Sequence, residues 1–139
     1  EKGVAVFARV PLGSGLLSGK YTAETTFDKD DHRSYNRNGE AFDVGETFSG
    51  VPFGEGVAAA GELKAALPEG VTLPAATLAW IASRSGVTSV IPGARSAEQA
   101  AANAAAADLL EGGFDLDAFD ALVRDVYDRR LRAEIHPQW

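Results

Sequence analysis

Two short apolar segments, each rich in β-branched residues and each ended by proline and glycine, constrain this chain more than any other feature. The first is "GVAVFARV" (Gly3 to Val10), followed by Pro11 and Gly13, and the second is "VTSVI" (Val87 to Ile91), followed by Pro92-Gly93. Such runs are typical of parallel strands buried on both faces. Because helices separate the two segments, the chain is predicted to be α/β, with crossover helices joining parallel strands.

Helical periodicity and capping residues predict about four helices between and after the strands. The third of them is expected to begin near Ala97, because Ser96 and Gln99 form the S-x-x-Q pattern of a capping box. The expected segments are Val57 to Leu67, Thr72 to Gly86, Ala97 to about Leu109, and a stripe from Leu116 to Leu131 opened by Asp115 or Asp117. Trp80 and Trp139 are expected to be structural.

A long loop precedes these helices. Tyr21 to Gly54 carries turn-forming residues and scattered aromatic side chains without a sustained period. Long loops in compact domains are usually lids or disordered segments, and the spaced aromatics favour a packed lid.

The composition excludes several classes of partner. The chain has 20 Asp and Glu residues against 13 Lys and Arg residues, for a net charge of −7, so its overall field repels nucleic acid and anionic membranes. It has no cysteine, which excludes disulfides and thiolate metal sites, and no apolar run approaches the roughly 20 residues of a membrane span. We expect a soluble, cytoplasmic protein with neither nucleic acid nor membrane as a partner, and we assign no metal ligand.

The number of strands suggests that the chain is part of a larger fold. Two buried parallel strands leave unpaired backbone groups at both edges, so further strands are expected beside them. The chain also contains no methionine and opens directly on a strand segment. We therefore expect residues 1–139 to be a fragment of a longer polypeptide, which associates with itself or folds poorly without the rest of its fold.

The turn "VIPGARSAEQAAANAAAA" after the second segment has the outline of a phosphate site. Gly93 lets a ligand approach the backbone, Arg95 supplies a cation, and a capped helix N-terminus follows. Gln99 and Asn103 lie four residues apart, so both amides could reach one ligand, such as a purine base. The alternative is an ordinary strand-to-helix turn with a surface arginine.

The glycine-rich stretch "ARVPLGSGLLSGKY" (Ala8 to Tyr21) is neither of the two common nucleotide motifs. Ser14 and Tyr21 stand where a P-loop needs glycine and Ser or Thr. Gly13, Gly15 and Gly19 are spaced one residue too long for G-x-G-x-x-G. What remains is a strand end with open backbone N–H groups and Lys20 as a nearby cation, which is a plausible pyrophosphate cradle.

Together, "RVPLGSGLLSGKY" and "VIPGARSAEQAAANAAA" resemble the C-terminal part of an aldo-keto reductase, and "DHRSYNRNGEAFDVGETFSGV" and "YDRRLRAEIHPQW" resemble a bacterial, NADPH-dependent branch of that family. The resemblance implies a (β/α)8 TIM barrel whose seventh and eighth strands are the two segments above, with NADP(H) bound at the strand ends. The chain would then be the cofactor-binding part of an enzyme that reduces aldehydes or ketones to alcohols.

The same resemblance implies a role for individual residues. Arg9 would stack on the nicotinamide, where many relatives have an aromatic side chain, and Arg33 would clamp the pyrophosphate from the long loop. The pyrophosphate would be lined by Pro11, Leu12, Gly13, Ser14 and Lys20, and the adenosine 2′-phosphate and adenine by Gly93, Arg95, Gln99 and Asn103. Arg95 is the residue that argues for NADP over NAD.

No catalytic residue is assigned. The family's Asp, Tyr, Lys and His belong to earlier strands, and nothing around the tyrosines of this chain supplies their Lys and His partners. We expect the chain alone to be inactive, with a tyrosine from absent sequence as proton donor. Two other interpretations stay open: a non-catalytic NADP-binding, sensing or interaction module on the same fold, and a general phosphate-binding domain with no preference for the 2′-phosphate.

Overall fold

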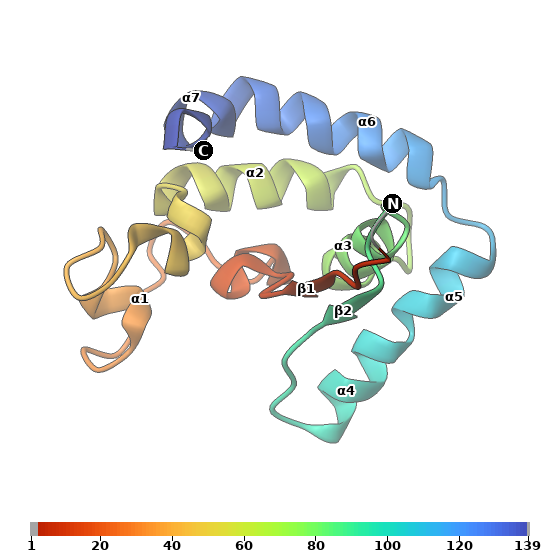
Figure 1. Ribbon diagram of the computed structural model, residues 1–139, viewed down its shortest axis with the longest axis horizontal. Coiled ribbons are helices and arrows are strands. Elements are labelled where there is room, and N and C mark those ends of the chain that lie inside the picture. The colour runs from red at the N-terminus through yellow and green to blue at the C-terminus, as the bar shows by residue number, and fades with distance from the viewer. Residues whose placement is uncertain (1–2, 139) are drawn as a thin grey trace.

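The computed structural model describes residues 3–138, with two strands and a series of helices (Figure 1). The strands are β1 (Phe7–Arg9) and β2 (Ser89–Ile91). The helices are α1 (His32–Tyr35), α2 (Phe53–Ala65), α3 (Leu73–Ala82), α4 (Ala97–Ala104), α5 (Ala106–Glu111), α6 (Leu116–Val126) and α7 (Arg132–Ile135). Shorter helical turns are η1 (Gly13–Ser18), η2 (Val44–Glu46), η3 (Phe48–Gly50), a π-helical η4 (Tyr127–Leu131) and η5 (His136–Gln138).

The predicted parallel pairing of the two strands is confirmed. β1 and β2 are hydrogen-bonded neighbours in one sheet, with Ala8 opposite Val90 and Arg9 opposite Ile91. The expected burial on both faces is not found: Phe7 is 59% and Ile91 55% exposed. Within residues 3–138 each strand has only the other as a neighbour, so the outer edges and much of the apolar surface of the sheet stay uncovered.

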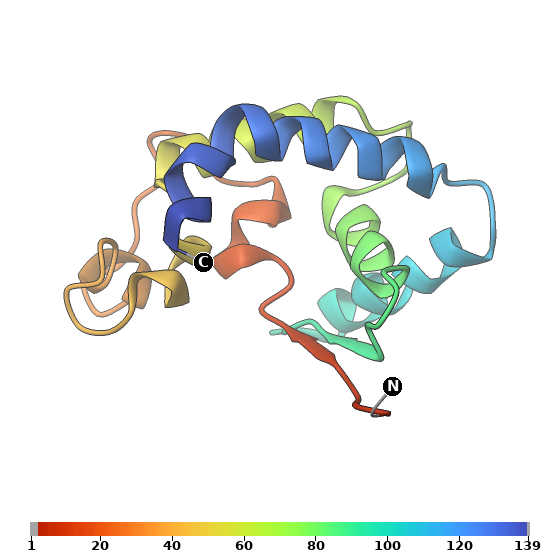
Figure 2. The same cartoon turned by 45° about the horizontal axis from the view of Figure 1, so that its top comes forward.

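The core lies between the helices. Side chains of α2, α3 and α6 form one buried cluster of Ala59, Ala60, Leu63, Leu73, Ala76, Phe119 and Val126. Figures 1 and 2 both show α6 running alongside α2, with α3 beneath them on the side of the sheet. Trp80 packs against this cluster and donates its indole N–H to Asp120 at 2.9 Å, so its predicted structural role is confirmed. Trp139 lies outside the described residues.

The helix that was expected at Val57 to Leu67 begins four residues earlier, at Phe53, after Pro52 at the N-cap. Gly54 and Gly56 make this start look like loop in the sequence. Gly56 is buried in α2, and a Cβ there would come within 2.6 Å of Leu16. Glycine is therefore needed for η1 to approach the helix, and its presence does not mark a break.

The remaining helices follow their caps. Thr72 caps α3, Ser96 caps α4 and Asp115 caps α6, each by accepting a backbone N–H with its side chain, as predicted. The single helix that was expected from Ala97 to Leu109 is interrupted at Ala105, where a tighter turn separates α4 from α5. The last stripe continues past α6 through the π-helical turn into α7.

The long loop is a packed lid that contains α1 and two short helical turns. Its aromatic rings cluster: Phe27 lies 5.8 Å from Phe53 and 6.0 Å from Phe48, ring centre to ring centre. Asn36, at the end of α1, is fully buried and accepts the backbone N–H groups of Ala41 and Phe42, both at 2.8 Å. Within the described residues, no helix is both long and apolar enough to cross a membrane.

Candidate functional site

One pocket of about 580 Å³ lies where the chain leaves β1 and β2. Because the strands are parallel and in register, their C-terminal ends meet at the same edge of the sheet, and ligands in α/β folds bind outside such ends. Most of the predicted binding residues line this pocket: Pro11, Leu12, Ser14, Lys20, Arg33, Gly93, Arg95 and Gln99. The structure therefore brings the strand ends, η1 and the lid together around one cavity.

Three predicted residues do not line this pocket. Arg9, at the end of β1, pairs its guanidinium with the carboxylate of Glu46 at 3.0 Å, and Gly13 starts η1 beside the cavity. Asn103 lies on α4 and donates its side-chain amide to the carbonyl of Gly93 at 3.1 Å. Of these, Asn103 is coupled to the pocket through the Gly93 backbone.

The turn between β2 and α4 is held in place by side chains of α4. Ser96 accepts the N–H of Gln99 at 3.2 Å, which is the first half of the predicted capping box. The second half differs: the Gln99 side-chain oxygen accepts the N–H of Arg95, at 2.6 Å, and not that of the capping serine. Together with the bond from Asn103, this fixes the backbone on both sides of Ala94, so the amides brace the turn.

The pocket is cationic in a chain of net charge −7. Lys20, Arg33 and Arg95 line it, and Asp31 is the carboxylate among its lining residues. Within the described residues, Arg95 is the only arginine whose guanidinium makes no hydrogen bond or ion pair, and the Lys20 ammonium makes none either. Two cations from neighbouring strand ends are thus available to a ligand with negative charge.

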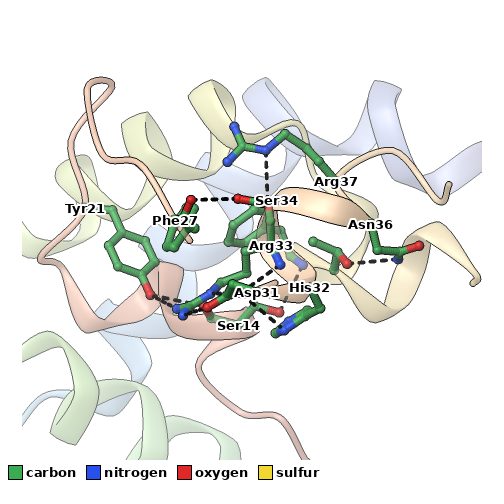
Figure 3. A network of polar contacts seen from close by, with 11 residues as sticks. Ser14, Tyr21, Phe27, Asp31, His32, Arg33, Ser34, Asn36 and Arg37 are labelled. Carbon is green, nitrogen blue, oxygen red and sulfur yellow. Dashed lines mark hydrogen bonds and ion pairs between the residues drawn. The ribbon is translucent and has the colours of Figure 1, made fainter. Parts of the chain in front are cut away.

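The third cation is held within the lid (Figure 3). Arg33 donates Nε and Nη2 to the two carboxylate oxygens of Asp31, and Nη1 to the hydroxyl of Tyr21. Asp31 is also the N-cap of α1 and accepts the backbone N–H of Arg33 at 2.9 Å. Hydrogen bonding to the Arg33 side chain holds the pKa of Asp31 well below its usual range, so the carboxylate is ionised at neutral pH.

Ser14 joins the lid to the strand end. Its hydroxyl accepts the N–H of Phe48 at 3.1 Å, and its carbonyl accepts the Tyr21 hydroxyl at 3.3 Å. Ser14 and Phe48 both have positive φ, 52° and 53°, a conformation that costs energy for residues with a side chain. The strained backbone occurs where η1 and η3 are in contact, and Ser14 lines the pocket at this point.

Sequence reasoning missed Tyr21, Asp31 and His32, which all line the pocket. The Asp31 side chain is only 22% exposed and is bonded to Arg33, whereas the three residues before it, 28–30, are exposed. The available signal was local: an aspartate two residues before an arginine can cap a helix and bind that arginine at once.

Comparison with known proteins gives one match. The family model described as the aldo/keto reductase family matches residues 1–122. No curated protein and no solved structure matches the chain.

Proposed function

The chain belongs to the aldo/keto reductase family, and we propose that its pocket binds NADP(H) for an oxidoreductase that reduces an aldehyde or ketone substrate. The family implies a (β/α)8 barrel and oxidoreductase chemistry, and the parallel β1 and β2 are consistent with two strands of that barrel. We propose further that these are its seventh and eighth strands, in the bacterial NADPH-dependent branch.

The residues at the pocket fit a phosphorylated dinucleotide. A volume of about 580 Å³ lies within the range of cofactor sites, and three cations face one carboxylate around it. In the proposed arrangement Lys20 binds the pyrophosphate, Arg33 covers it from the lid, and Arg95 binds the 2′-phosphate beside the start of α4. The nicotinamide would supply a hydride to the substrate carbonyl.

The observation that carries this proposal is the pair of unpartnered cations. Lys20 and Arg95 follow different strands, are 75 positions apart in the sequence (95 − 20), and line the same cavity. Most other arginines of the chain are neutralised by carboxylates, as the salt bridges of Arg84 and Arg129 illustrate. Cations that are kept free at a shared pocket are best explained by an anionic ligand with at least two separated phosphate groups.

The chain alone is expected to catalyse no reduction, because none of its residues is assigned the role of the family's catalytic Asp, Tyr, Lys or His. We also propose that the open sheet is completed in the working protein by the rest of the barrel, and that it self-associates otherwise. The exposure of Phe7 and Ile91 on adjacent strands supports this. A monodisperse monomer with cooperative melting in analytical ultracentrifugation and calorimetry would contradict self-association.

Titration calorimetry with NADPH and NADH tests the proposed ligand. Arg95→Gln is expected to weaken NADPH binding about 10-fold to 100-fold, the worth of a charge-assisted hydrogen-bonded pair, and to leave NADH binding within about twofold. Lys20→Gln is expected to weaken both ligands, whereas Lys29→Gln removes an equal charge from an exposed position and serves as the control. Equal affinities for NADPH and NADH would favour a general phosphate-binding domain, and absence of binding would refute the proposal.

A further inference from the structure

Arg33 lies at the lid side of the pocket with its guanidinium fixed on two sides. Asp31 accepts two of its N–H groups and Tyr21 a third. The plane of the guanidinium also lies near the Phe27 ring, whose centre is 4.4 Å from Cζ. An arginine side chain has several rotatable bonds, and these contacts fix most of them before any ligand arrives.

These contacts leave part of Arg33 available. A guanidinium has five N–H groups, and the bonds to Asp31 and Tyr21 use three of them. The side chain is 18% exposed and lines the pocket, and the other two N–H groups, one on each Nη, make no hydrogen bond within the described residues. Arg33 therefore keeps two N–H groups that can donate to a ligand while it is paired with Asp31.

Asp31 and Tyr21 are themselves held. Asp31 is fixed to the start of α1 by the backbone N–H of Arg33. The Tyr21 hydroxyl lies directly over Gly15, so close that a Cβ at Gly15 would overlap it, and it donates to the carbonyl of Ser14. The η1 turn, through Gly15 and Ser14, thus determines where the Tyr21 hydroxyl accepts the N–H group of Arg33.

We propose that Asp31 and Tyr21 are positioning residues, which hold the Arg33 guanidinium in the orientation that binds the pyrophosphate of the dinucleotide. This inference rests on the proposed function, since it concerns the same pocket. It predicts a change in ligand affinity that is opposite in sign to the change expected from charge repulsion alone. A carboxylate beside a polyanion repels it, so neutralising Asp31 should strengthen binding if the residue only contributes charge. If Asp31 positions Arg33, neutralising it should weaken binding.

Asp31→Asn separates the two cases. Asparagine caps helices as well as aspartate does, so α1 keeps its start while Arg33 loses its ionic partner. Asp30→Asn is the matched control, because it removes the same charge one residue away and outside the pocket lining. We expect NADPH affinity to fall about fivefold to thirtyfold in Asp31→Asn, and to change by less than about twofold in Asp30→Asn, in titration calorimetry.

The affinity for adenosine 2′-monophosphate distinguishes a positioning role from a structural one. A general loss of structure in Asp31→Asn would lower this affinity as much as the affinity for NADPH. Adenosine 2′-monophosphate carries no pyrophosphate and would contact only the turn after β2, so its affinity should be the same in Asp31→Asn and in the wild-type chain. In addition, the Arg33 Nε–H signal in NMR should exchange slowly with water in the wild type and rapidly in Asp31→Asn.

Tyr21→Phe is the second variant, since it removes the hydroxyl but keeps the ring that packs on Phe27 at 5.2 Å. Its control is Tyr35→Phe, at an exposed tyrosine outside the pocket lining. A several-fold loss of NADPH affinity is expected in Tyr21→Phe alone.

The outcomes distinguish this inference from the proposed function. NADPH affinity in Asp31→Asn equal to or above that in Asp30→Asn would overturn the positioning role and leave the cofactor proposal standing. A matching loss of adenosine 2′-monophosphate affinity would also overturn it, because the effect would then be a general loss of structure. If the wild-type chain binds neither ligand, the proposed function is wrong and the inference falls with it.

Discussion

Asn36 is expected to control the stability of the lid, and its contribution can be worked out from its contacts. The side chain is fully buried, accepts the N–H groups of Ala41 and Phe42, and donates to the Thr47 hydroxyl at 3.1 Å. Asn36→Ala removes all three hydrogen bonds. At a net value of about 1 kcal/mol each, the lid loses about 3 kcal/mol of its free energy of unfolding.

Two other variants calibrate this value. Thr47→Val removes only the bond from the Asn36 amide, so its cost is expected to be about 1 kcal/mol, one third of the total. Asn38→Ala removes an exposed asparagine whose side chain bonds only to Glu40, and should stay within about 0.5 kcal/mol of the wild type.

Limited proteolysis within residues 21–54 is the appropriate assay, because a lid can open without unfolding the helical core. Cleavage that depends on opening should accelerate by about two orders of magnitude in Asn36→Ala, which is the rate equivalent of 3 kcal/mol, and by about fivefold in Thr47→Val. Equal cleavage rates for Asn36→Ala and Asn38→Ala would show that the buried amide does not hold the lid, and would refute the reasoning.

Three further predictions concern the pocket and its turns. Gly15→Ala should displace the Tyr21 hydroxyl and weaken NADPH binding in calorimetry, whereas Gly70→Ala, at a positive φ with open space around it and outside the pocket lining, should leave binding unchanged and cost only about 1 kcal/mol in urea unfolding. The pKa of Asp31 is lowered in the fold, so its stabilisation is full above the unfolded pKa of about 3.9 and is lost as the pH falls. Acid titration of lid proteolysis should show a smaller acid-induced rise in Asp31→Asn than in the wild type, because the lowered pKa values of Glu40 and Glu46 leave part of the pH dependence in place. Ser96→Ala should destabilise α4 by about 1 kcal/mol in urea unfolding, because it removes the cap.

The elements that sequence predicted well are those decided by nearby residues. Proline and glycine end the strands, and Thr72, Ser96 and Asp115 cap helices that begin where their side chains require. The start of α2 was missed because the reason for Gly56 is its contact with Leu16, forty residues earlier in the chain (56 − 16). From the sequence alone, a glycine that allows two elements to pack closely cannot be distinguished from a glycine that ends a helix.

The residues of the candidate site fall into the same two groups, those whose positions depend on nearby sequence and those whose positions depend on distant contacts. Lys20 and Arg95 could be predicted because each follows a strand, and neighbouring parallel strands have their C-terminal ends at the same edge of the sheet. Asp31 and Tyr21 could not, because their positions depend on how the lid folds back over η1. That path is determined by contacts between distant segments, such as the Phe48 N–H with Ser14, which no local pattern encodes.

Gln99 and Asn103 show why a correct local pattern can leave a role open. Two amides four residues apart lie on the same helix face. Both can therefore hydrogen-bond to a ligand or to the backbone of the preceding turn. In the fold they brace the turn with the Gln99 oxygen and the Asn103 nitrogen. Bracing therefore leaves the Gln99 nitrogen as a donor and the Asn103 oxygen as an acceptor, which is the pair that the N7 and N6 edge of adenine requires. Bracing of the turn and the adenine contact that we propose therefore use different atoms of the same two amides.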